Sequence, residues 1–364
     1  MPAVSHPQLL AEIAACQKQV DAYILQPRFH AGFAPEHLRN AIYAYLERPA
    51  KRLRPAVLIF ACGATGGQED TVIPAAAAVE VCHTWTLVHD DIIDNDRLRR
   101  GHPTVHVQAA EWARTQWAYD EAAARRYGRD IGILTGDVQH GWAVSMFLEC
   151  CRNGRIGSDV VVELLHHMES SVVPRLIAGE TLDVQFSRRP VDSLTESEVL
   201  EMLYLKTGVL YGFAGLAGAC LGANAVPDSC AISQAISRFA AGCGTAFQLQ
   251  DDILGVVGLE AKLGKPVGAD LREGKRTIIL LHALRHAKEE QRRLLDTVVG
   301  NHDAAPEDIA KATRLLLDLG SVDFTRRLAE ERLRNAIAEL EPVPDSFRKS
   351  CLLAWADYMI HRES

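Results

Sequence analysis

Apolar residues along this chain recur mainly at spacings of three and four, the period of a helix with one buried face. Alternating runs of β-branched and aromatic residues bounded by turns, which would indicate strands, are scarce. The pattern therefore predicts an all-α protein. The expected helices cover residues 7–25, 34–47, 53–64, 73–95, 103–125, 130–152, 157–187, 194–222, 229–257, 275–299, 305–319, 322–340 and 344–361.

The chain contains no repeat, low-complexity tract or linker rich in proline, glycine and serine. Residues 1–364 are therefore expected to form a single domain, although this exceeds the usual domain size. Most prolines fall between the predicted helices or in their first turns. Pro174 is an exception, and we expect it to kink the helix predicted over 157–187.

Composition narrows the class of protein. A net charge of −8 argues against nucleic acid as the main partner, because that role needs a dominant basic surface. The nine cysteines are odd in number and lack CxxC spacing, so they are interpreted as reduced core residues. No signal peptide and no transmembrane segment is expected, so the predicted location is the cytoplasm.

Two aspartate-rich stretches lie near the C-terminal ends of long apolar helices. Asp90, Asp91 and Asp94 form the first, and Asp251 and Asp252 the second. Carboxylates at a helix C-terminus oppose the helix dipole and repel one another, so the arrangement costs stability unless a cation compensates. Ligands that offer only oxygen favour Mg²⁺. The five aspartates are therefore candidate metal ligands.

The alternative for such a stretch is a solvated acidic helix end. For one motif alone the two interpretations are balanced, whereas two motifs on separate apolar helices favour metal binding. His89 adjoins the first motif and is interpreted as a packing residue, because a single histidine beside three carboxylates is seldom a ligand for Mg²⁺.

Three basic clusters accompany the acidic motifs. Arginine and lysine side chains bind diphosphate oxygens directly, so these clusters together favour a chemistry with two diphosphate groups. Each cluster alone is more typical of surface decoration. The clusters cover residues 51–54, 97–100 and 265–276.

In this order the stretches resemble the motifs of the trans-polyprenyl synthase family, which includes farnesyl and geranylgeranyl diphosphate synthases. The resemblance extends over about residues 40–290. The family's acidic motifs, Arg-Arg-Gly turn, Lys-Thr pair and Phe-Gln pair are all recognisable. The matching stretches are 51–55, 90–94, 99–101, 206–208 and 247–252.

The resemblance implies a role for each candidate residue. Three Mg²⁺ ions would bridge an allylic diphosphate and the aspartates named above. The same diphosphate would be bound by Arg99, Lys206, Lys265 and Lys275. Isopentenyl diphosphate would be bound by Lys51, Arg54, His83 and Arg100. The residues facing the developing cation would be Lys206, Thr207 and Gln248. The resemblance also implies a single-domain helical bundle around a central cavity, and a homodimer.

The chain departs from the family pattern at several positions. Pro49 and Ala50 stand where two glycines are usual, and Gly255 replaces a third aspartate of the second motif. Glu180 stands where glutamine is more usual. The stretch 107–130 is about a dozen residues longer than in compact members, and is interpreted as a plain surface helix, with a lid or interface element as the alternative.

The implied reaction ionises an allylic diphosphate, which isopentenyl diphosphate then attacks. The allylic substrate would be dimethylallyl, geranyl or farnesyl diphosphate. Trp85 lies five residues before the first motif, where in the family an aromatic residue limits product length; Thr86 lies one turn below Asp90 on the same face. The expected product is farnesyl diphosphate first and geranylgeranyl diphosphate second. The alternatives are a class I terpene cyclase and a non-catalytic subunit of a heteromeric synthase.

Overall fold

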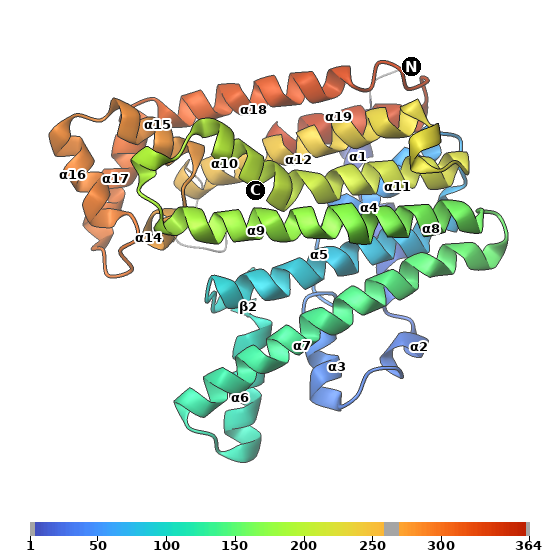
Figure 1. Ribbon diagram of the computed structural model, residues 1–364, viewed down its shortest axis with the longest axis horizontal. Coiled ribbons are helices and arrows are strands. Elements are labelled where there is room, and N and C mark those ends of the chain that lie inside the picture. Colours follow the sequence, from blue (N-terminus) through green and yellow to red (C-terminus); the bar gives the residue numbers. More distant parts are fainter. Residues whose placement is uncertain (1–3, 258–268, 362–364) are drawn as a thin grey trace. The chain divides into compact units, whose positions relative to one another are not determined.

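The computed structural model describes residues 4–257 and 269–361, and its regular structure is almost entirely helical (Figure 1). Within these residues the strands are two, of two residues each. The predicted all-α class is confirmed.

The chain divides into two compact units that alternate along the sequence. Unit 1 comprises Met1–His167, Ala214–Ile236 and Val343–Ala354. Unit 2 comprises Met168–Phe213, Ser237–Pro342 and Trp355–Ser364. That residues 1–364 form a single domain, as expected from the sequence, remains a prediction.

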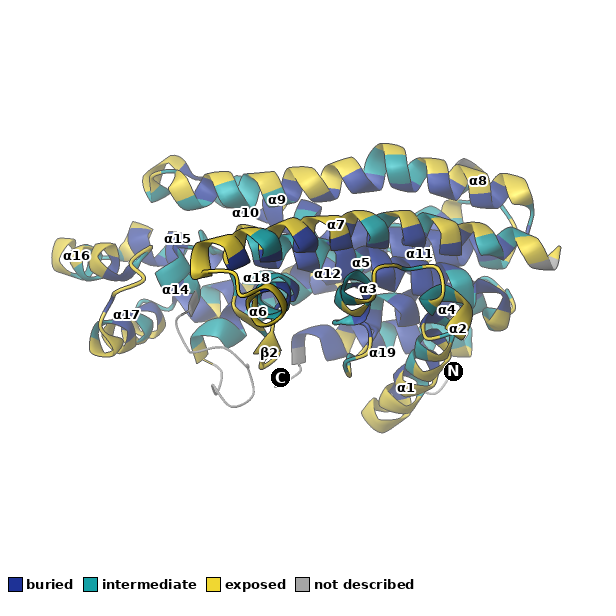
Figure 2. Cartoon of the chain, turned by 90° about the horizontal axis from the view of Figure 1, so that it is seen from below, coloured by how far each residue is buried: buried dark blue, intermediate teal, exposed yellow. Residues whose placement is uncertain are grey.

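Unit 1 is built on the apolar helix α5, which packs against α1, α4 and α7, while α6 packs against α7 (Figure 1). Figure 2 shows α7 buried along one side and exposed along the other. The elements of this unit are α1 (His6–Ile24), α2 (Pro27–His30), α3 (Glu36–Tyr43), α4 (Leu53–Ala64), η1 (Glu69–Val72), α5 (Ile73–Ile93), β1 (Leu98–Arg99), β2 (His102–Pro103), α6 (Val105–Trp117), α7 (Glu121–Leu148), η2 (Glu149–Asn153), α8 (Ser158–His167) and η6 (Pro227–Ser229).

Helix α5 ends at the first acidic motif because Asn95 takes the left-handed conformation, with a φ of 55°. The backbone N–H of Asn95 bonds to the carbonyl of Ile92 at 3.3 Å, and that of Asp96 to the carbonyl of Asp91 at 2.9 Å. This double closure is the Schellman motif, in which asparagine is a common alternative to glycine. It places the acidic residues in the last turn of the helix.

A tight hairpin follows. Leu98 pairs with Pro103 and Arg99 with His102 in antiparallel register. The two residues of the turn, Arg100 and Gly101, have φ angles of 53° and 75°, as a two-residue turn that fits the twist of a hairpin requires. The turn separates the two neighbouring arginines, one on a strand and one at the tip.

The predicted break between residues 125 and 130 is wrong. Helix α6 ends at Trp117 and α7 begins at Glu121. Ala118 is left-handed, with a φ of 52°, and the side chain of Asp120 caps α7 by accepting a hydrogen bond from the N–H of Ala123. An aspartate cap therefore decides this boundary, and the helix then continues without a break through residues 126–129.

Unit 2 packs its helices around two clusters of buried apolar side chains. Three helices contain residues of both units. The elements of unit 2 are η3 (Met168–Val172), α9 (Val173–Arg188), η4 (Val191–Ser193), α10 (Glu196–Leu203), η5 (Tyr204–Gly208), α14 (Ala269–Glu273), α15 (Ile278–His286), α16 (Glu289–Val298), α17 (Pro306–Asp318) and α18 (Ser321–Ala338), and the shared helices are α11 (Val209–Ala223), α12 (Ala231–Val257) and α19 (Phe347–His361).

Two helical segments of unit 2, η3 and η5, are π-helical turns. The first immediately precedes Pro174, where the sequence predicts an irregularity, and Pro174 lies in the first turn of α9. Such turns are frequent at functional positions. The helix predicted over 275–299 is two helices, because the backbone is extended at Ala287 and Lys288.

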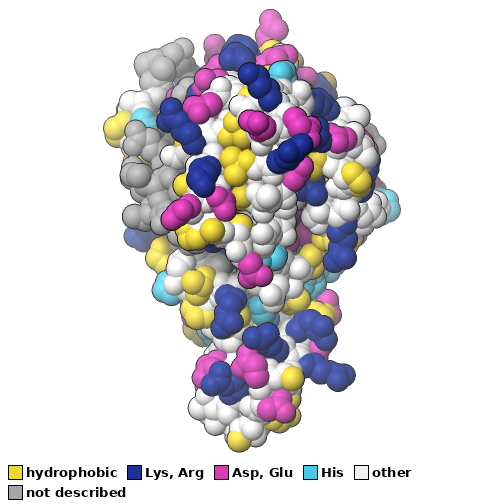
Figure 3. Space-filling model, turned by 90° about the vertical axis from the view of Figure 1, so that its left-hand side faces the viewer, with side chains coloured by type: hydrophobic (Ala, Val, Ile, Leu, Met, Phe, Trp, Pro, Cys, Tyr) yellow, Lys and Arg dark blue, Asp and Glu magenta, His cyan; other side chains and the backbone are white. Residues whose placement is uncertain are grey.

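Two helical stretches, Glu69–Ile93 and Glu196–Ala223, are long and apolar enough to span a membrane by length and composition. Their most apolar windows are 72% and 83% buried within the protein, as in the core helices of a globular fold. On the face seen in Figure 3, basic and acidic side chains are interspersed.

Candidate functional site

In unit 1 the first acidic motif is paired with an arginine of the hairpin. Nε of Arg99 donates to both carboxylate oxygens of Asp91, at 2.7 and 2.9 Å, and Nη2 donates to Oδ2 of Asp90 at 3.0 Å. The hydroxyl of Tyr45 donates to Oδ2 of Asp91. Burial raises the pKa of Asp91, while the Arg99 guanidinium opposes that shift. Asp94 is the C-terminal cap residue of α5.

Arg52, which the sequence does not single out, occupies the interior beside the first basic cluster. It is 4% exposed, and its φ of 48° is left-handed. Its guanidinium binds Asp21 and Glu80, both at 2.8 Å, and the carbonyl of Leu46 at 2.5 Å. These contacts tie α1, α5 and the segment after α3 to the start of α4.

The sequence places Lys51 and Arg54 on one helix face only if the helix starts before residue 51. Helix α4 begins at Leu53, so Lys51 lies outside it and that arrangement is not found. Arg52 lies between them with its side chain buried, whereas Lys51 is exposed. The spacing of three residues between Lys51 and Arg54 therefore does not place them on one helix face.

The structure gathers other residues predicted to bind isopentenyl diphosphate. Partial burial, followed by the positive charges of Arg54 and Arg100, lowers the pKa of His83 well below its usual range. The imidazole is therefore neutral at physiological pH and available as a hydrogen-bond partner. Arg100, at the tip of the hairpin, is exposed.

In unit 2, Lys206 lies within the π-helical turn η5 and faces α9. Its ammonium group pairs with Oε2 of Glu180 at 2.8 Å and with Oδ2 of Asp183 at 2.7 Å. The two segments approach closely because Gly179 has no side chain: a Cβ there would lie 2.4 Å from the backbone nitrogen of Lys206. Glu180, which departs from the family pattern, is thus one of the two carboxylates that pair with this lysine.

A short chain of hydrogen bonds joins η5 to the second acidic motif. The hydroxyl of Thr207 donates to the carbonyl of the Gln248 side chain at 3.1 Å, and the amide of Gln248 donates to Oδ1 of Asp252 at 3.4 Å. These are residues that the sequence assigns to the reacting centre. Asp251 lies next to them on α12 and is partly exposed.

Asp252 is 8% exposed, and burial is the main cause that raises its pKa, to about 8. The negative charge of Asp270, on α14, raises it further, whereas the hydrogen bond from Gln248 and the charge of Lys275 lower it. At Gly255, where many family members have a third aspartate, a Cβ would lie 2.8 Å from Oδ2 of Asp270. The carboxylate of Asp270 thus lies beside the position at which that third aspartate would start.

Both acidic clusters offer oxygen atoms alone, the donor set that suits Mg²⁺. Oδ2 of Asp252 is buried, and no residue that the structure describes donates a hydrogen bond to it. Within 4–257 and 269–361, no three His, Cys, Asp or Glu side chains form a ready-made metal site. The residues therefore fit an ion that takes one or two carboxylates and completes its shell with water and phosphate oxygens.

The remaining candidates have separate outcomes. Lys275 pairs with Glu273 at 3.2 Å. Lys265 lies outside the described residues. Trp85 is 8% exposed and packs on His140 with ring centroids 4.9 Å apart. The hydroxyl of Thr86 bonds to the carbonyl of His83 within the same helix, at 2.8 Å.

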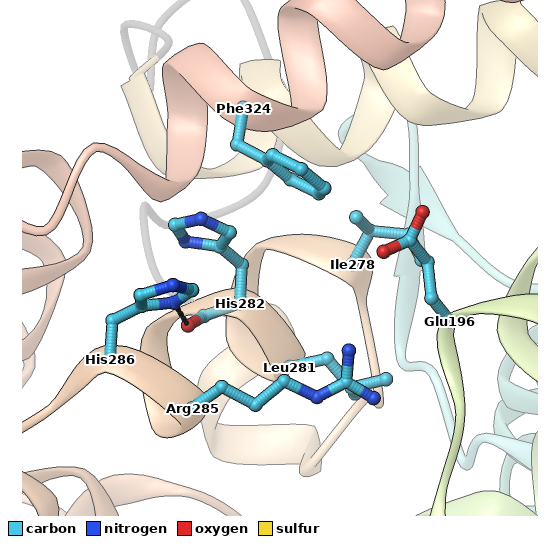
Figure 4. A pocket seen from close by; sticks show the side chains of 7 residues that line it. All are labelled: Glu196, Ile278, Leu281, His282, Arg285, His286 and Phe324. Atoms are coloured by element: carbon cyan, nitrogen blue, oxygen red, sulfur yellow. Dashed lines mark hydrogen bonds between the residues drawn. The ribbon is translucent and has the colours of Figure 1, made fainter.

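A cavity of about 250 Å³ in unit 2 is lined by none of the predicted residues (Figure 4). Stacked rings of Phe324, His282 and His286 form one side of it, with centroid distances of 4.4 and 4.1 Å. Arg285 and Glu196 lie at its lower and right-hand margins in the view. This cavity is therefore not formed by the acidic and basic residues described above.

The sequence does not reveal several partners of the candidate residues. Tyr45 carries no motif that would single it out, and Asp270 is recognised only as a member of a basic cluster. Asp183 lies three residues after Glu180, which departs from the family pattern. Its pairing with Lys206 depends on the packing of α9 against η5. A contact between residues far apart in the chain leaves no trace in local spacing.

Comparisons with known proteins show which family the chain resembles. The family described as Polyprenyl synthetase matches residues 35–316. The chain is 37% identical to a geranylgeranyl diphosphate synthase of Methanosarcina mazei over 90% of this chain and 91% of that protein. It is 30% identical to a geranylfarnesyl diphosphate synthase of Aeropyrum pernix, over 94% and 99%. The crystal structure of a geranylgeranyl pyrophosphate synthetase from Pyrococcus horikoshii Ot3 superposes with a TM-score of 0.83 at 29% identity, over 98% and 99%.

Proposed function

This chain belongs to the polyprenyl synthetase family, and we propose that it is a short-chain prenyltransferase joining isopentenyl diphosphate to an allylic diphosphate. The observation that carries the proposal is the family match over residues 35–316, which includes both acidic motifs. The products are a prenyl diphosphate longer by one five-carbon unit, and pyrophosphate.

The reaction requires the allylic carbon–oxygen bond to break with its electron pair leaving on the diphosphate. The π bond of isopentenyl diphosphate then forms the new carbon–carbon bond, and a proton is lost to give the product alkene, with the released pyrophosphate as its acceptor. No nucleophilic serine, cysteine or lysine is needed. Alignment of the two substrates lowers the remaining barrier.

The side chains of this chain would hold the two diphosphates and the developing positive charge. Arg99 and Lys206 bind the allylic diphosphate, with Lys265 and Lys275 in support. The neutral imidazole of His83 contributes a hydrogen bond to isopentenyl diphosphate. The other residues that bind isopentenyl diphosphate are Lys51, Arg54 and Arg100, and those that face the cation are Thr207 and Gln248.

The family uses Mg²⁺. Bound ions, for which we propose three per site, neutralise charge on the departing diphosphate as Lewis acids. The residues that would hold them are Asp90, Asp91, Asp94, Asp251 and Asp252. Asp91 would do so while it keeps its hydrogen bonds from Arg99 and Tyr45, because a carboxylate offers about four acceptor sites.

We further propose geranylgeranyl diphosphate as the main product, with farnesyl diphosphate as the shorter one. The M. mazei relative bears the first name, and the buried ring of Trp85 supports a short chain. The enzyme is proposed to act in the cytoplasm as a homodimer, as family resemblance implies.

The proposal is tested by incubating the purified protein with geranyl diphosphate, isopentenyl diphosphate and Mg²⁺. Pyrophosphate is expected only when both prenyl substrates are present. Release from geranyl diphosphate alone would support a terpene cyclase. No release at all from correctly folded protein would support a non-catalytic subunit.

Replacing Trp85 by alanine is expected to lengthen the product by one or two five-carbon units, because in the family pattern an aromatic residue at this position limits product length. Radiolabelled products are separated by chain length. Trp117→Ala is the matched control, because this ring is 47% exposed on α6 and should leave the product unchanged. An identical product distribution for Trp85→Ala and wild type refutes this role for the ring.

A further inference from the structure

The side chain of Tyr45 joins two elements at the first acidic motif. It is 6% exposed and packs with Val88 of α5 and Val105 of α6. Its hydroxyl donates to Oδ2 of Asp91, at the end of α5, and accepts from the backbone N–H of Val105, at the start of α6, at 3.1 Å. This one hydroxyl therefore donates to α5 and accepts from α6.

Asp91 carries this contact onward to the hairpin. The carboxylate is fully buried, at 0% exposure, and accepts from Tyr45 on Oδ2 and from Arg99 on both oxygens. Rotation of the carboxylate would break the paired bonds from Nε of Arg99. The orientation of Asp91 thus determines the orientation of the guanidinium.

Arg99 has one edge left for a ligand. Nε and Nη2 are engaged by Asp91 and Asp90, whereas Nη1 makes no hydrogen bond to any residue that the structure describes. The side chain of Arg99 is 20% exposed. A guanidinium with two nitrogens fixed on carboxylates can still donate from the third to a phosphate oxygen.

We propose that Tyr45 is a positioning residue that, through Asp91, holds Arg99 in the orientation that receives the allylic diphosphate. The inference rests on the proposed function, because that function assigns the diphosphate to Arg99. An apolar ring would fill the same pocket, but it would leave the N–H of Val105 without its partner and Oδ2 of Asp91 with the bond from Arg99 alone. The hydroxyl is thus present for orientation rather than for packing.

Tyr45→Phe is the direct test in the full-length protein. The KM for geranyl diphosphate is expected to rise about tenfold, as for one charge-assisted hydrogen bond, and the KM for isopentenyl diphosphate to change less than twofold. Tyr43→Phe is the matched control. Tyr43 is equally buried, but its hydroxyl has no hydrogen-bond partner among the described residues, so both KM values should stay unchanged.

A double-mutant cycle separates positioning from general loss of structure. In an Arg99→Ala background, Tyr45→Phe should have almost no further effect on the KM for geranyl diphosphate. The same tenfold rise in that background, or equal rises in both KM values, would overturn the inference. If Tyr45→Phe does not fold, Val105→Pro removes the N–H that holds the hydroxyl, and proline is tolerated in the first turn of a helix. The same KM split is expected for it, and its absence counts against the inference.

Calorimetric binding of inorganic pyrophosphate in the presence of Mg²⁺ makes the test independent of turnover. Tyr45→Phe should weaken pyrophosphate binding by about tenfold, as one charge-assisted hydrogen bond would, with Tyr43→Phe unchanged. If the wild-type protein binds pyrophosphate but does not convert geranyl and isopentenyl diphosphates, the proposed function fails. The difference in pyrophosphate binding between Tyr45→Phe and Tyr43→Phe still decides the role of Tyr45. Wild type that binds no pyrophosphate would overturn both.

Discussion

Asp90→Asn is expected to lower kcat by a factor of about 10²–10³, the loss typical of removing one group that stabilises charge on a departing oxygen. Asparagine keeps the shape of the side chain but removes the negative charge that would bind a cation at the end of α5. The measurement is pyrophosphate release at saturating geranyl and isopentenyl diphosphates with Mg²⁺.

This loss should occur without unfolding. Asp90 is partly exposed and stands with other acids at the C-terminus of a helix, so removal of its charge relieves repulsion from the helix dipole by about 0.3–1 kcal/mol. That gain offsets the lost contact with Arg99, and the melting temperature should change by only about a few degrees. Asp137→Asn, an exposed acid on α7, is the control and should keep full activity. An Asp90→Asn enzyme with more than a tenth of wild-type kcat would show that this carboxylate is dispensable.

Glu80→Ala is expected to lower the free energy of unfolding by about 3–5 kcal/mol. It leaves the buried guanidinium of Arg52 without one of its two carboxylates, since Glu80 accepts from Nη1 at 2.8 Å. Arg52 is 4% exposed, so water does not replace the lost partner. Urea denaturation monitored by circular dichroism gives the change in stability.

The double replacement Arg52→Met with Glu80→Leu should cost less than Glu80→Ala alone, because it removes both buried charges together. Glu111→Ala breaks a solvent-exposed pair with Arg114 and serves as the control, with an expected cost of about 1 kcal/mol or less. Equal losses for Glu80→Ala and Glu111→Ala would mean that the buried network contributes no more than a surface pair does.

Helical periodicity and motif order are properties of the sequence alone, and they determine the fold class, the position of both acidic motifs and the family. Local hydrogen bonding decides where the helices end. The left-handed residues Asn95 and Ala118 interrupt periodic stretches without disturbing their apolar pattern. The spacing of apolar residues therefore locates helices well and their boundaries poorly.

What the tertiary structure decides is which charges meet. From the sequence, the basic residues of the cluster 51–54 are equivalent, yet packing buries Arg52 against Asp21 and Glu80, whereas Lys51 is exposed. Asp91 is likewise equivalent to its neighbours in sequence, and only the fold brings Tyr45 to it. The physical reason is that periodicity reflects the burial of a helix face as a whole, whereas the partner of a single charge depends on residues dozens of positions away.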